Sequence, residues 1–328
     1  MNVTVFSALA FEQPFLNQAN LGRHAVQYYA QRLTDQTVPL AQGAAAVSVF
    51  GSDDLSAPVL AQLWAHGVRY VLVRATGTDQ LDLPAAHRLG LRVAHVPDYS
   101  PHAIAEHAVA LLLALARHLR RADQQLRAND FRLDKLIGFE LRGKTVGIVG
   151  VGHIGAVLAG ILHGFGCRLL GQDLRPDDAL RQRYGLEYVD LPTLCAQADI
   201  VSLHTPLTAA TQYLFGDELL GQLKPGAVLL NTGRGGVLDT AAALRALASG
   251  QLGYLGLDVY EGEQGLFFAD HTRDPLRDAT FAKLLTYDNV FMTAHQGYLT
   301  REALASLAAA AVAAFDAWGL GQPAAHEL

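Results

Sequence analysis

The segment that most constrains the fold of this chain is Gly150-Val151-Gly152-His153-Ile154-Gly155. It follows an apolar run at Thr145–Val149 that predicts a strand, and it precedes an apolar run at Ala156–Phe165 that predicts a helix. In that context the first glycine allows a tight turn, the second lets the backbone approach a pyrophosphate, and the third lets the helix pack closely on the sheet. We favour a dinucleotide site over the alternative, a glycine-rich turn that serves only helix packing.

Asp173 stands at the end of the next predicted strand. A carboxylate at this position accepts hydrogen bonds from an adenine-ribose diol and repels a 2′-phosphate. The sequence therefore predicts NAD in preference to NADP. Arg175 lies close by and would tolerate a phosphate, so it weakens this preference without reversing it.

Short apolar runs alternate with helical patterns along the whole chain, which is typical of a mostly parallel sheet with helices on both faces. A chain of 328 residues exceeds one ordinary core. We therefore expect two doubly wound α/β domains, with hinges near residues 99 and 297 and a cleft between the domains. A long helix is expected from His102 to about Ala128, and an Ala-rich helix from Thr300 to Trp318. The predicted strands are Val3–Ser7, Ala46–Phe50, Tyr70–Arg74, Arg92–His95, Thr145–Gly150, Arg168–Asp173, Ile200–Leu203, Val228–Asn231, Leu255–Val259 and Val290–Thr293.

Composition limits the classes of protein to which the chain can belong. Hydrophobic residues make up 51% and charged residues 17%, which favours a well-buried globular enzyme over a disordered chain. The net charge of −6, without a long run of one sign, gives no indication of a nucleic acid or membrane partner. Cys167 and Cys195 lack metal-ligand spacing and are interpreted as buried free thiols. We expect a soluble, cytoplasmic protein that holds no metal ion.

Polar residues follow three of the predicted strands in the second half of the chain, at the strand ends where ligands gather in open α/β sheets. Arg234 is flanked by glycines, and its planar guanidinium can bind a carboxylate through two hydrogen bonds. His295 is a residue type suited to proton transfer near neutral pH, and Glu261 or Glu263 can supply the carboxylate that orients it. On the residues alone, a solvated loop arginine and an ordinary core histidine remain open alternatives.

Further motifs occur in a fixed order along the chain. They are Arg74-Ala75-Thr76-Gly77, Val96-Pro97-Asp98-Tyr99-Ser100-Pro101, Ala105-Glu106-His107-Ala108, His204-Thr205-Pro206-Leu207-Thr208, Asn231-Thr232-Gly233-Arg234-Gly235-Gly236, Asp258-Val259-Tyr260-Glu261-Gly262-Glu263 and His295-Gln296-Gly297-Tyr298-Leu299-Thr300. Together with the glycine fingerprint, they resemble the D-isomer-specific 2-hydroxyacid dehydrogenases over essentially the whole length. Within that family the chain resembles the fermentative D-lactate dehydrogenases.

The resemblance implies an NAD-dependent oxidoreductase that interconverts a small 2-oxo acid and the D-form of its 2-hydroxy acid, with pyruvate and D-lactate as the expected pair. It implies that Arg234, Glu263 and His295 are catalytic. The implied cofactor contacts are Gly150, Gly152, His153, Ile154, Gly155, Asp173, Thr205, Pro206, Thr211, Thr232, Gly233 and Asp258. The implied substrate contacts are Thr76, Gly77, Tyr99, Arg234, His295 and Tyr298. His107 is interpreted as a packing or capping residue of its helix.

The same resemblance implies a discontinuous, flavodoxin-like substrate-binding domain made of residues 1–100 and 297–328. Residues 101–296 would form a Rossmann-type NAD-binding domain. Because the family is commonly dimeric, we expect a homodimer. The chain departs from the family's pattern at Thr78, His153, Thr211 and Gly233, which bears on pocket size and cofactor affinity.

Two alternatives to a D-lactate dehydrogenase are considered. The first is a reductase of bulkier 2-oxo acids, such as phenylpyruvate or branched-chain acids. The segment Gln264–Asp278, which includes Phe267 and Phe268, resembles the lactate group and favours the smaller substrate. The second is an NAD-sensing corepressor or scaffold on the same fold. The intact set of Arg234, Glu263 and His295 argues against a protein whose only task is binding.

Overall fold

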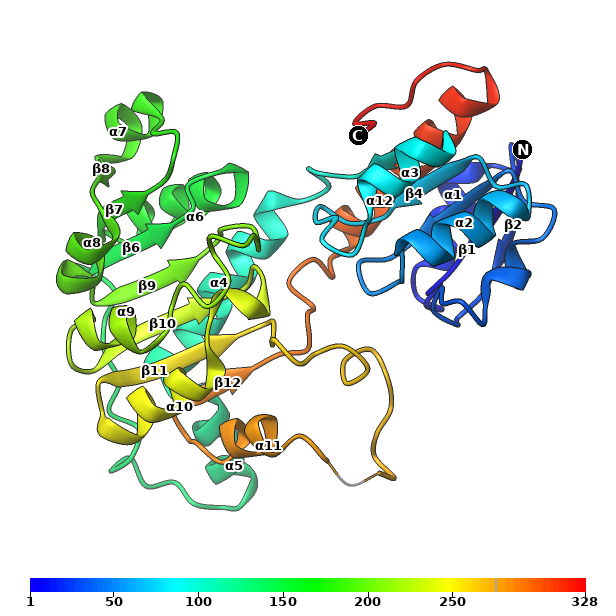
Figure 1. Cartoon of the computed structure of the whole chain (residues 1–328). Helices are drawn as coiled ribbons and strands as arrows, with labels where there is room; N and C mark the ends of the chain where they lie inside the picture. The colour runs from blue at the N-terminus through cyan, green and yellow to red at the C-terminus, as the bar shows by residue number, and fades with distance from the viewer. Residues whose placement is uncertain (275) are drawn as a thin grey trace. The chain divides into compact units, whose positions relative to one another are not determined.

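The computed structural model describes residues 1–274 and 276–328. The chain divides into two compact units (Figure 1). Unit 1 comprises Met1–Ser100 and Leu299–Leu328, and unit 2 comprises Pro101–Tyr298. Each unit is an α/β structure with one parallel sheet.

Unit 1 contains a five-stranded parallel sheet in the order β2-β1-β3-β4-β5. The strands are β1 (Asn2–Val5), β2 (Ala25–Tyr28), β3 (Ala46–Val49), β4 (Tyr70–Val73) and β5 (Arg92–His95). The helices of this unit are α1 (Gln13–Asn20), η1 (Val38–Ala41), α2 (Ala57–Ala65), α3 (Leu83–Leu89) and α12 (Arg301–Gly319). This strand order is that of the flavodoxin-like doubly wound fold.

Alternate residues of the unit 1 strands face two different hydrophobic cores. Val47 and Val71 pack in one core with residues of α2 and α3, and Ala46 and Leu72 pack in the other with residues of α12. A parallel strand covered on both faces is apolar throughout, because neither face meets water. This explains why these strands appear in the sequence as continuous apolar runs.

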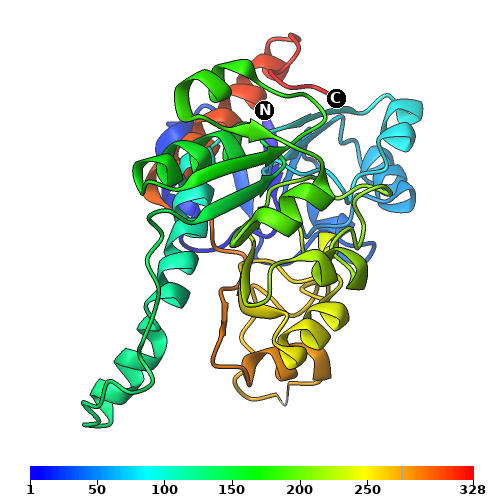
Figure 2. The same cartoon turned by 90° about the vertical axis from the view of Figure 1, so that its left-hand side faces the viewer.

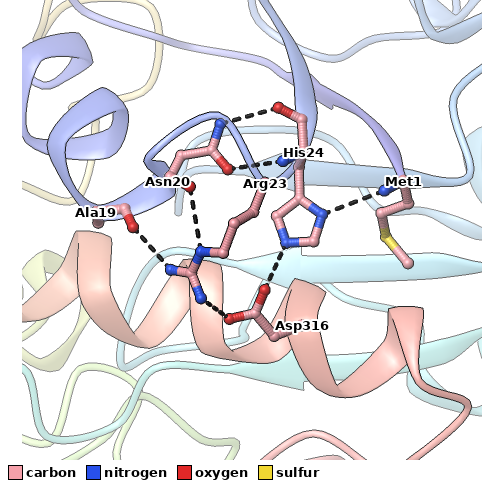
Figure 3. A network of polar contacts seen from close by, with 6 residues as sticks. All are labelled: Met1, Ala19, Asn20, Arg23, His24 and Asp316. Atoms are coloured by element: carbon pink, nitrogen blue, oxygen red, sulfur yellow. Dashed lines mark hydrogen bonds and ion pairs between the residues drawn. The ribbon is translucent and has the colours of Figure 1, made fainter.

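Polar contacts fasten α12 to the turn between α1 and β2 (Figure 3). Asp316 of α12 forms an ion pair with Arg23, and its Oδ1 lies 2.9 Å from Nε2 of His24. The Asn20 side chain donates to the carbonyl of His24 and accepts from its backbone N–H. Trp318, two residues further along α12, stacks on Tyr70 at 5.0 Å between ring centroids. These contacts make α12 an integral part of unit 1.

Among the described residues, α12 alone is long and apolar enough, by length and composition, to be a candidate membrane span. Half of its apolar window is buried inside the protein. Leu307, Ala311 and Phe315 contribute to one of the two cores of unit 1. Core packing therefore accounts for its composition.

Unit 2 contains a seven-stranded parallel sheet in the order β12-β11-β10-β9-β6-β7-β8 (Figure 1). The strands are β6 (Thr145–Val149), β7 (Arg168–Gln172), β8 (Glu187–Tyr188), β9 (Ile200–Leu203), β10 (Ala227–Asn231), β11 (Leu252–Leu257) and β12 (Val290–Met292). The helices are α4 (Pro101–Ala116), α5 (Leu119–Arg127), α6 (His153–Gly164), α7 (Asp178–Tyr184), α8 (Leu191–Gln197), α9 (Asp217–Gln222), η2 (Gly235–Val237), α10 (Thr240–Ser249) and α11 (Ala279–Leu285). The order is that of a Rossmann fold with one further strand, and it reverses between β6 and β9.

The fold class predicted from the sequence, two doubly wound α/β domains, is confirmed. Two strands were not predicted. Strand β2 is an edge strand whose residues are partly or fully exposed, so it lacks an apolar run, and β8 has only two residues. Both lie at the edge of their sheet. Because edge strands are less buried, they need fewer apolar residues and are harder to predict from the sequence.

The prediction of one long helix from His102 to Ala128 was wrong, because the helix is interrupted after Ala116. His118 adopts a left-handed backbone conformation with φ of 50°. The carbonyl of Ala116 accepts a hydrogen bond from the backbone N–H of Phe139 at 3.1 Å. A Cβ on Gly138 would lie 2.0 Å from that carbonyl oxygen, so only glycine permits the crossing. A contact between residues far apart in the sequence therefore ends α4.

Candidate active site

The glycine fingerprint forms the turn between β6 and α6, next to the point where the strand order reverses. Gly150 has φ of 88°, and a Cβ on it would lie 2.8 Å from the backbone of His204. A Cβ on Gly155 would lie 2.3 Å from the carbonyl oxygen of Gly150. Around Gly152, at the start of α6, nothing lies within 4 Å of the Cβ position. The turn thus leaves open space in front of a helix N-terminus, which is where a pyrophosphate binds in such folds.

The structure places Asp173 beside this turn. Its Oδ2 accepts a hydrogen bond from the backbone N–H of Val151 at 2.6 Å, and its Oδ1 accepts one from Arg175 N–H at 2.9 Å. A carboxylate has about four acceptor sites. Two bonds therefore leave capacity for the hydroxyls of a ribose.

Three buried polar atoms at the ends of β9 and β10 have no hydrogen-bond partner within the described part of the chain. They are Nδ1 of His204, Oγ1 of Thr205 and Oγ1 of Thr232. Burial lowers the pKa of His204 to about 4, so its ring is neutral, and its Nε2 lies 2.8 Å from the hydroxyl of Ser202. An unsatisfied buried polar group costs about 1–3 kcal/mol. Unpaired atoms at the crevice where these sheets bind ligands fit a polar cofactor such as NAD.

Hydrogen bonds to the backbone of the loop after β10 fix the position from which the Arg234 side chain extends. The Asn231 side chain donates to the carbonyl of Arg234 at 2.9 Å and accepts from the N–H of Gly233 at 3.1 Å. Gly235 lies against the backbone of Tyr260, since a Cβ would be 2.2 Å from its carbonyl carbon. The loop after β10 is thereby packed against the segment that follows β11, and the partly exposed Arg234 side chain starts from a fixed backbone.

His295 and Glu263 are in hydrogen-bond contact, in the loops that follow β12 and β11. Nδ1 of His295 lies 2.7 Å from Oε1 of Glu263, and each side chain is about one quarter exposed. The other carboxylate oxygen of Glu263 accepts from the backbone N–H of Tyr260 at 3.1 Å. Glu261 instead accepts from the backbone N–H of Thr240. The residue pattern left Glu261 and Glu263 open and the family resemblance favoured Glu263. Glu263 is the carboxylate that contacts His295, and it leaves the Nε2 edge of the ring for another group.

Asp258 is buried and binds the turn that carries His295. Its Oδ1 accepts from Oγ1 of Thr293 at 2.5 Å and from the N–H of Gln296 at 2.9 Å, and its Oδ2 accepts from the N–H of Gly297 at 2.7 Å. Burial alone would raise the pKa of this carboxyl, but hydrogen bonds from His107, Thr293 and Gln296 outweigh it and lower the pKa. The sequence assigned Asp258 to the cofactor, but its carboxylate oxygens already accept hydrogen bonds from residues of the protein.

Phe268 adds an aromatic ring beside this pair. Its ring centroid lies 5.9 Å from that of His295, and its backbone has φ of 63°. The preceding Phe267 is buried and packs edge-on against Phe281 at 5.8 Å. The sequence singled out the segment Gln264–Asp278, in which residue 275 lies outside the described residues, but not the contact of Phe268 with His295. No local pattern signals it.

The remaining predicted residues divide between the two units. His153 and Ile154 lie in the first turn of α6, and Tyr298 is buried in unit 2. The Thr211 hydroxyl bonds to the carbonyl of Pro206 at 2.6 Å, inside the loop after β9.

The predicted substrate contacts Thr76, Gly77 and Tyr99 belong to unit 1. The hydroxyl of Thr76 bonds to the carbonyl of Pro97 at 2.8 Å, so the segment after β4 is tied to the segment after β5. Tyr99 packs against the core that contains α12.

Comparison with known proteins finds the same family across the chain. The family model for the D-isomer specific 2-hydroxyacid dehydrogenase, NAD binding domain, matches residues 109–297. The D-lactate dehydrogenase kk1H of Curvularia clavata is 46% identical, over 100% of this chain and 95% of the relative. The pyruvate reductase of Chlamydomonas reinhardtii has a TM-score of 0.92 at 38% identity, covering 99% and 98% of the two chains. The apo-structure of D-lactate dehydrogenase from Escherichia coli has a TM-score of 0.90 at 39% identity, covering all of both chains.

The packing of Gly235 against Tyr260 generates a first prediction. Gly235→Ala should displace the loop that carries Arg234, because the added Cβ meets backbone and not a flexible side chain. We expect the thermal midpoint to fall by several degrees, as for a loss of about 1–3 kcal/mol from overpacking. Differential scanning calorimetry measures this. Gly221→Ala on α9 is the matched control, since nothing lies within 4 Å of its Cβ position. A midpoint for Gly235→Ala equal to that of the control would contradict the prediction.

Proposed function

The chain belongs to the D-isomer specific 2-hydroxyacid dehydrogenase family, and on that basis we propose that it reduces pyruvate to D-lactate with NADH. It is an NAD-dependent oxidoreductase that acts on the CH–OH group of D-2-hydroxy acids. Arg234, Glu263 and His295 are the proposed catalytic residues. The observation that carries this assignment is the 2.7 Å contact between His295 and Glu263 at neighbouring strand ends.

In the direction of reduction, Nε2 of protonated His295 donates a proton to the C2 oxygen of the substrate. The carboxylate of Glu263 accepts a hydrogen bond from Nδ1 of His295, so it orients the ring with Nε2 free to meet the substrate. Arg234 binds the substrate carboxylate through its planar guanidinium and polarises the C2 carbonyl. When bound, NADH supplies the hydride that reaches C2. In the direction of oxidation, neutral His295 accepts the proton back.

The proposed cofactor contacts follow from the fit of the crevice. Gly150, Gly152 and Gly155, with the N-terminal residues of α6, would hold the pyrophosphate. Asp173 would accept hydrogen bonds from the adenine ribose with its remaining lone pairs. Thr205, Pro206, Thr211, Thr232 and Gly233 line the loops after β9 and β10, and the buried hydroxyls of Thr205 and Thr232 are the natural partners for polar atoms of the cofactor. For Asp258 we propose an indirect role, through the turn of His295.

Residues 101–296 are the proposed NAD-binding domain, and residues 1–100 with 297–328 the proposed substrate-binding domain. Backbone N–H groups at Thr76 and Gly77 would bind the substrate carboxylate, with Tyr99 and Tyr298 as further contacts.

We propose a cytoplasmic location in a fermentative metabolism. Cys167 and Cys195 are both free and buried, which suits a reducing compartment.

A homodimer is proposed from an exposed apolar surface on unit 2. Helix α5 and the segment that follows it run away from the sheet of their own unit (Figure 2). The apolar side chains exposed along this stretch are Leu119, Leu126, Phe131, Leu133 and Ile137. Exposed patches of this kind in a soluble domain mark association surfaces. A second copy of the chain is the proposed occupant.

The proton-transfer assignment predicts effects of different size at the two members of the pair. His295→Gln should lower kcat/KM in both directions by about a hundredfold to ten-thousandfold, as for a lost acid–base catalyst. Glu263→Gln should lower kcat/KM by about tenfold to a hundredfold, because a neutral amide holds Nδ1 of His295 less firmly than the carboxylate does. Glu261 bonds to Thr240 instead, so Glu261→Gln is the control and should keep native kcat/KM. Equal kcat/KM values for Glu263→Gln and the control would show that the carboxylate is misassigned.

The position of Phe268 predicts the preferred substrate. A ring 5.9 Å from that of His295 confines the side chain of the 2-oxo acid, so kcat/KM should be higher for pyruvate than for phenylpyruvate. Phe268→Ala should raise the relative kcat/KM for phenylpyruvate, whereas Phe165→Ala at the far end of α6 should not. Steady-state kinetics with a panel of 2-oxo acids, followed by chiral analysis of the product, tests both points. A native preference for phenylpyruvate would instead support the reductase of bulkier acids.

The dimer proposal predicts that charge on the exposed surface separates the copies. Leu133→Lys combined with Ile137→Lys introduces like charges at residues that are 73% and 82% exposed. Sedimentation velocity should show a dimer for the native chain and a monomer for this variant. Leu320→Lys, at a 75% exposed leucine of unit 1, should remain dimeric. A native monomer, or a variant that stays dimeric, would exclude this surface.

A further inference from the structure

His107 of α4 contacts the turn that carries His295. Its Nε2 is 2.9 Å from Oγ1 of Thr293 and 3.3 Å from Oδ1 of Asp258. Its ring also lies against Gly297, since a Cβ on that glycine would be 3.5 Å from Cδ2 of His107. The interpretation of His107 as a packing or capping residue missed these bonds, because they join residues far apart in the sequence.

The hydrogen-bond directions around Thr293 follow from counting protons. The Thr293 hydroxyl has one proton, and the 2.5 Å contact with Asp258 uses it, because the buried carboxylate is an acceptor. The hydroxyl oxygen must therefore accept from His107, so Nε2 of His107 carries a proton. A chain of donors results: His107 donates mainly to Thr293 at 2.9 Å and more weakly to Asp258 at 3.3 Å, and Thr293 donates to Asp258.

Asp258 holds the backbone of the catalytic turn through both its carboxylate and its own carbonyl. Asp258 accepts from the N–H groups of Gln296 and Gly297, and its own carbonyl accepts from the N–H of His295 at 2.6 Å. His295 has φ of 51°, a conformation that L-residues rarely adopt without such support. Any rotation of the Asp258 carboxylate would loosen the N–H groups of Gln296 and Gly297 together, directly after His295.

We propose that His107 is a positioning residue for His295, acting through Thr293 and Asp258. The proposal rests on the proposed function, which assigns the proton transfer to His295. His107 fixes the orientation of the Asp258 carboxylate, and that carboxylate fixes the backbone from which the His295 ring reaches the substrate. The alternative is that His107 only fills space between α4 and the turn.

Substitutions that keep or remove the Nε2 donor separate these possibilities. The amide nitrogen of Gln reaches the place of Nε2, whereas that of Asn reaches the place of Nδ1. His107→Leu and His107→Asn should lower kcat for pyruvate reduction by about tenfold to a hundredfold, the scale of a small misplacement of a catalytic group. Their KM for NADH should stay within about twofold of the native value. His107→Gln should restore kcat to within about threefold. His163→Gln, on the exposed face of α6, is the control.

A second readout needs no cofactor. Hydrogen–deuterium exchange of the cofactor-free protein, followed by mass spectrometry, should show faster exchange in the peptide that contains Gln296 and Gly297 for His107→Leu. The same increase is expected for Thr293→Val, which breaks the donor chain one step later, and not for Thr293→Ser, which keeps the hydroxyl. The double variant His107→Leu with Thr293→Val should be no slower in kcat than the slower single variant. These Thr293 variants also carry the test if His107→Leu does not fold.

The outcomes that overturn the proposal are distinct from those that overturn the proposed function. If His295→Gln is inactive while His107→Leu keeps native kcat and native exchange, His107 does not position His295. If Gln, Asn and Leu at position 107 lower kcat and thermal midpoint equally, its role is packing alone. If His295→Gln itself keeps activity, the proposed function fails, and the exchange data then report only on the turn.

Discussion

Parallel pairing of β10, β11 and β12 is the constraint on which the site depends. Asn231 pairs with Leu257, and Leu257 pairs with Met292, so these strands end at the same level of the sheet. The loops that begin there carry Arg234, Glu263 and His295. Three groups that are 29 or more residues apart in sequence are thus brought to neighbouring loops by backbone hydrogen bonds alone. Each residue type can be recognised in the sequence, but the pairing of the strands determines that the three side chains lie on neighbouring loops.

Buried polar groups at the ends of β9, β10 and β11 fall into two classes with different meanings. Asp258 is almost completely buried, yet every donor it needs comes from the protein, and its role is to hold a turn. His204, Thr205 and Thr232 are buried with polar atoms that nothing in the described chain satisfies. Since buried polar groups are nearly always paired, the first class reports on structure and the second on a ligand. This contrast distinguishes the proposed cofactor residues more sharply than their positions in sequence motifs.

The features that the sequence predicted well are those coded by neighbouring residues. The glycine turn, the flanking strand and helix, and the apolar strands buried on both faces all follow from local pattern. The choice between Glu261 and Glu263 did not, because both follow the same strand and only the turn from Tyr260 to Glu263 decides which carboxylate meets His295. The break of the long helix depends on the segment at Gly138 and Phe139, and the role of His107 depends on Thr293. These contacts join residues that are far apart in the sequence, so no local periodicity predicts them.

The backbone of His295 shows what such contacts achieve energetically. A left-handed conformation at a residue other than glycine costs about 1–2 kcal/mol, and a free loop would relax from it. Here the N–H groups of three consecutive residues are all bonded to Asp258, one to its carbonyl and two to its carboxylate. Each such bond contributes about 0.5–1.5 kcal/mol, and more when the acceptor is charged. Their sum exceeds the strain, so the turn is stable in the conformation that aims the His295 ring at Glu263. The ring is therefore oriented before any substrate arrives, and substrate binding energy need not be spent on ordering it.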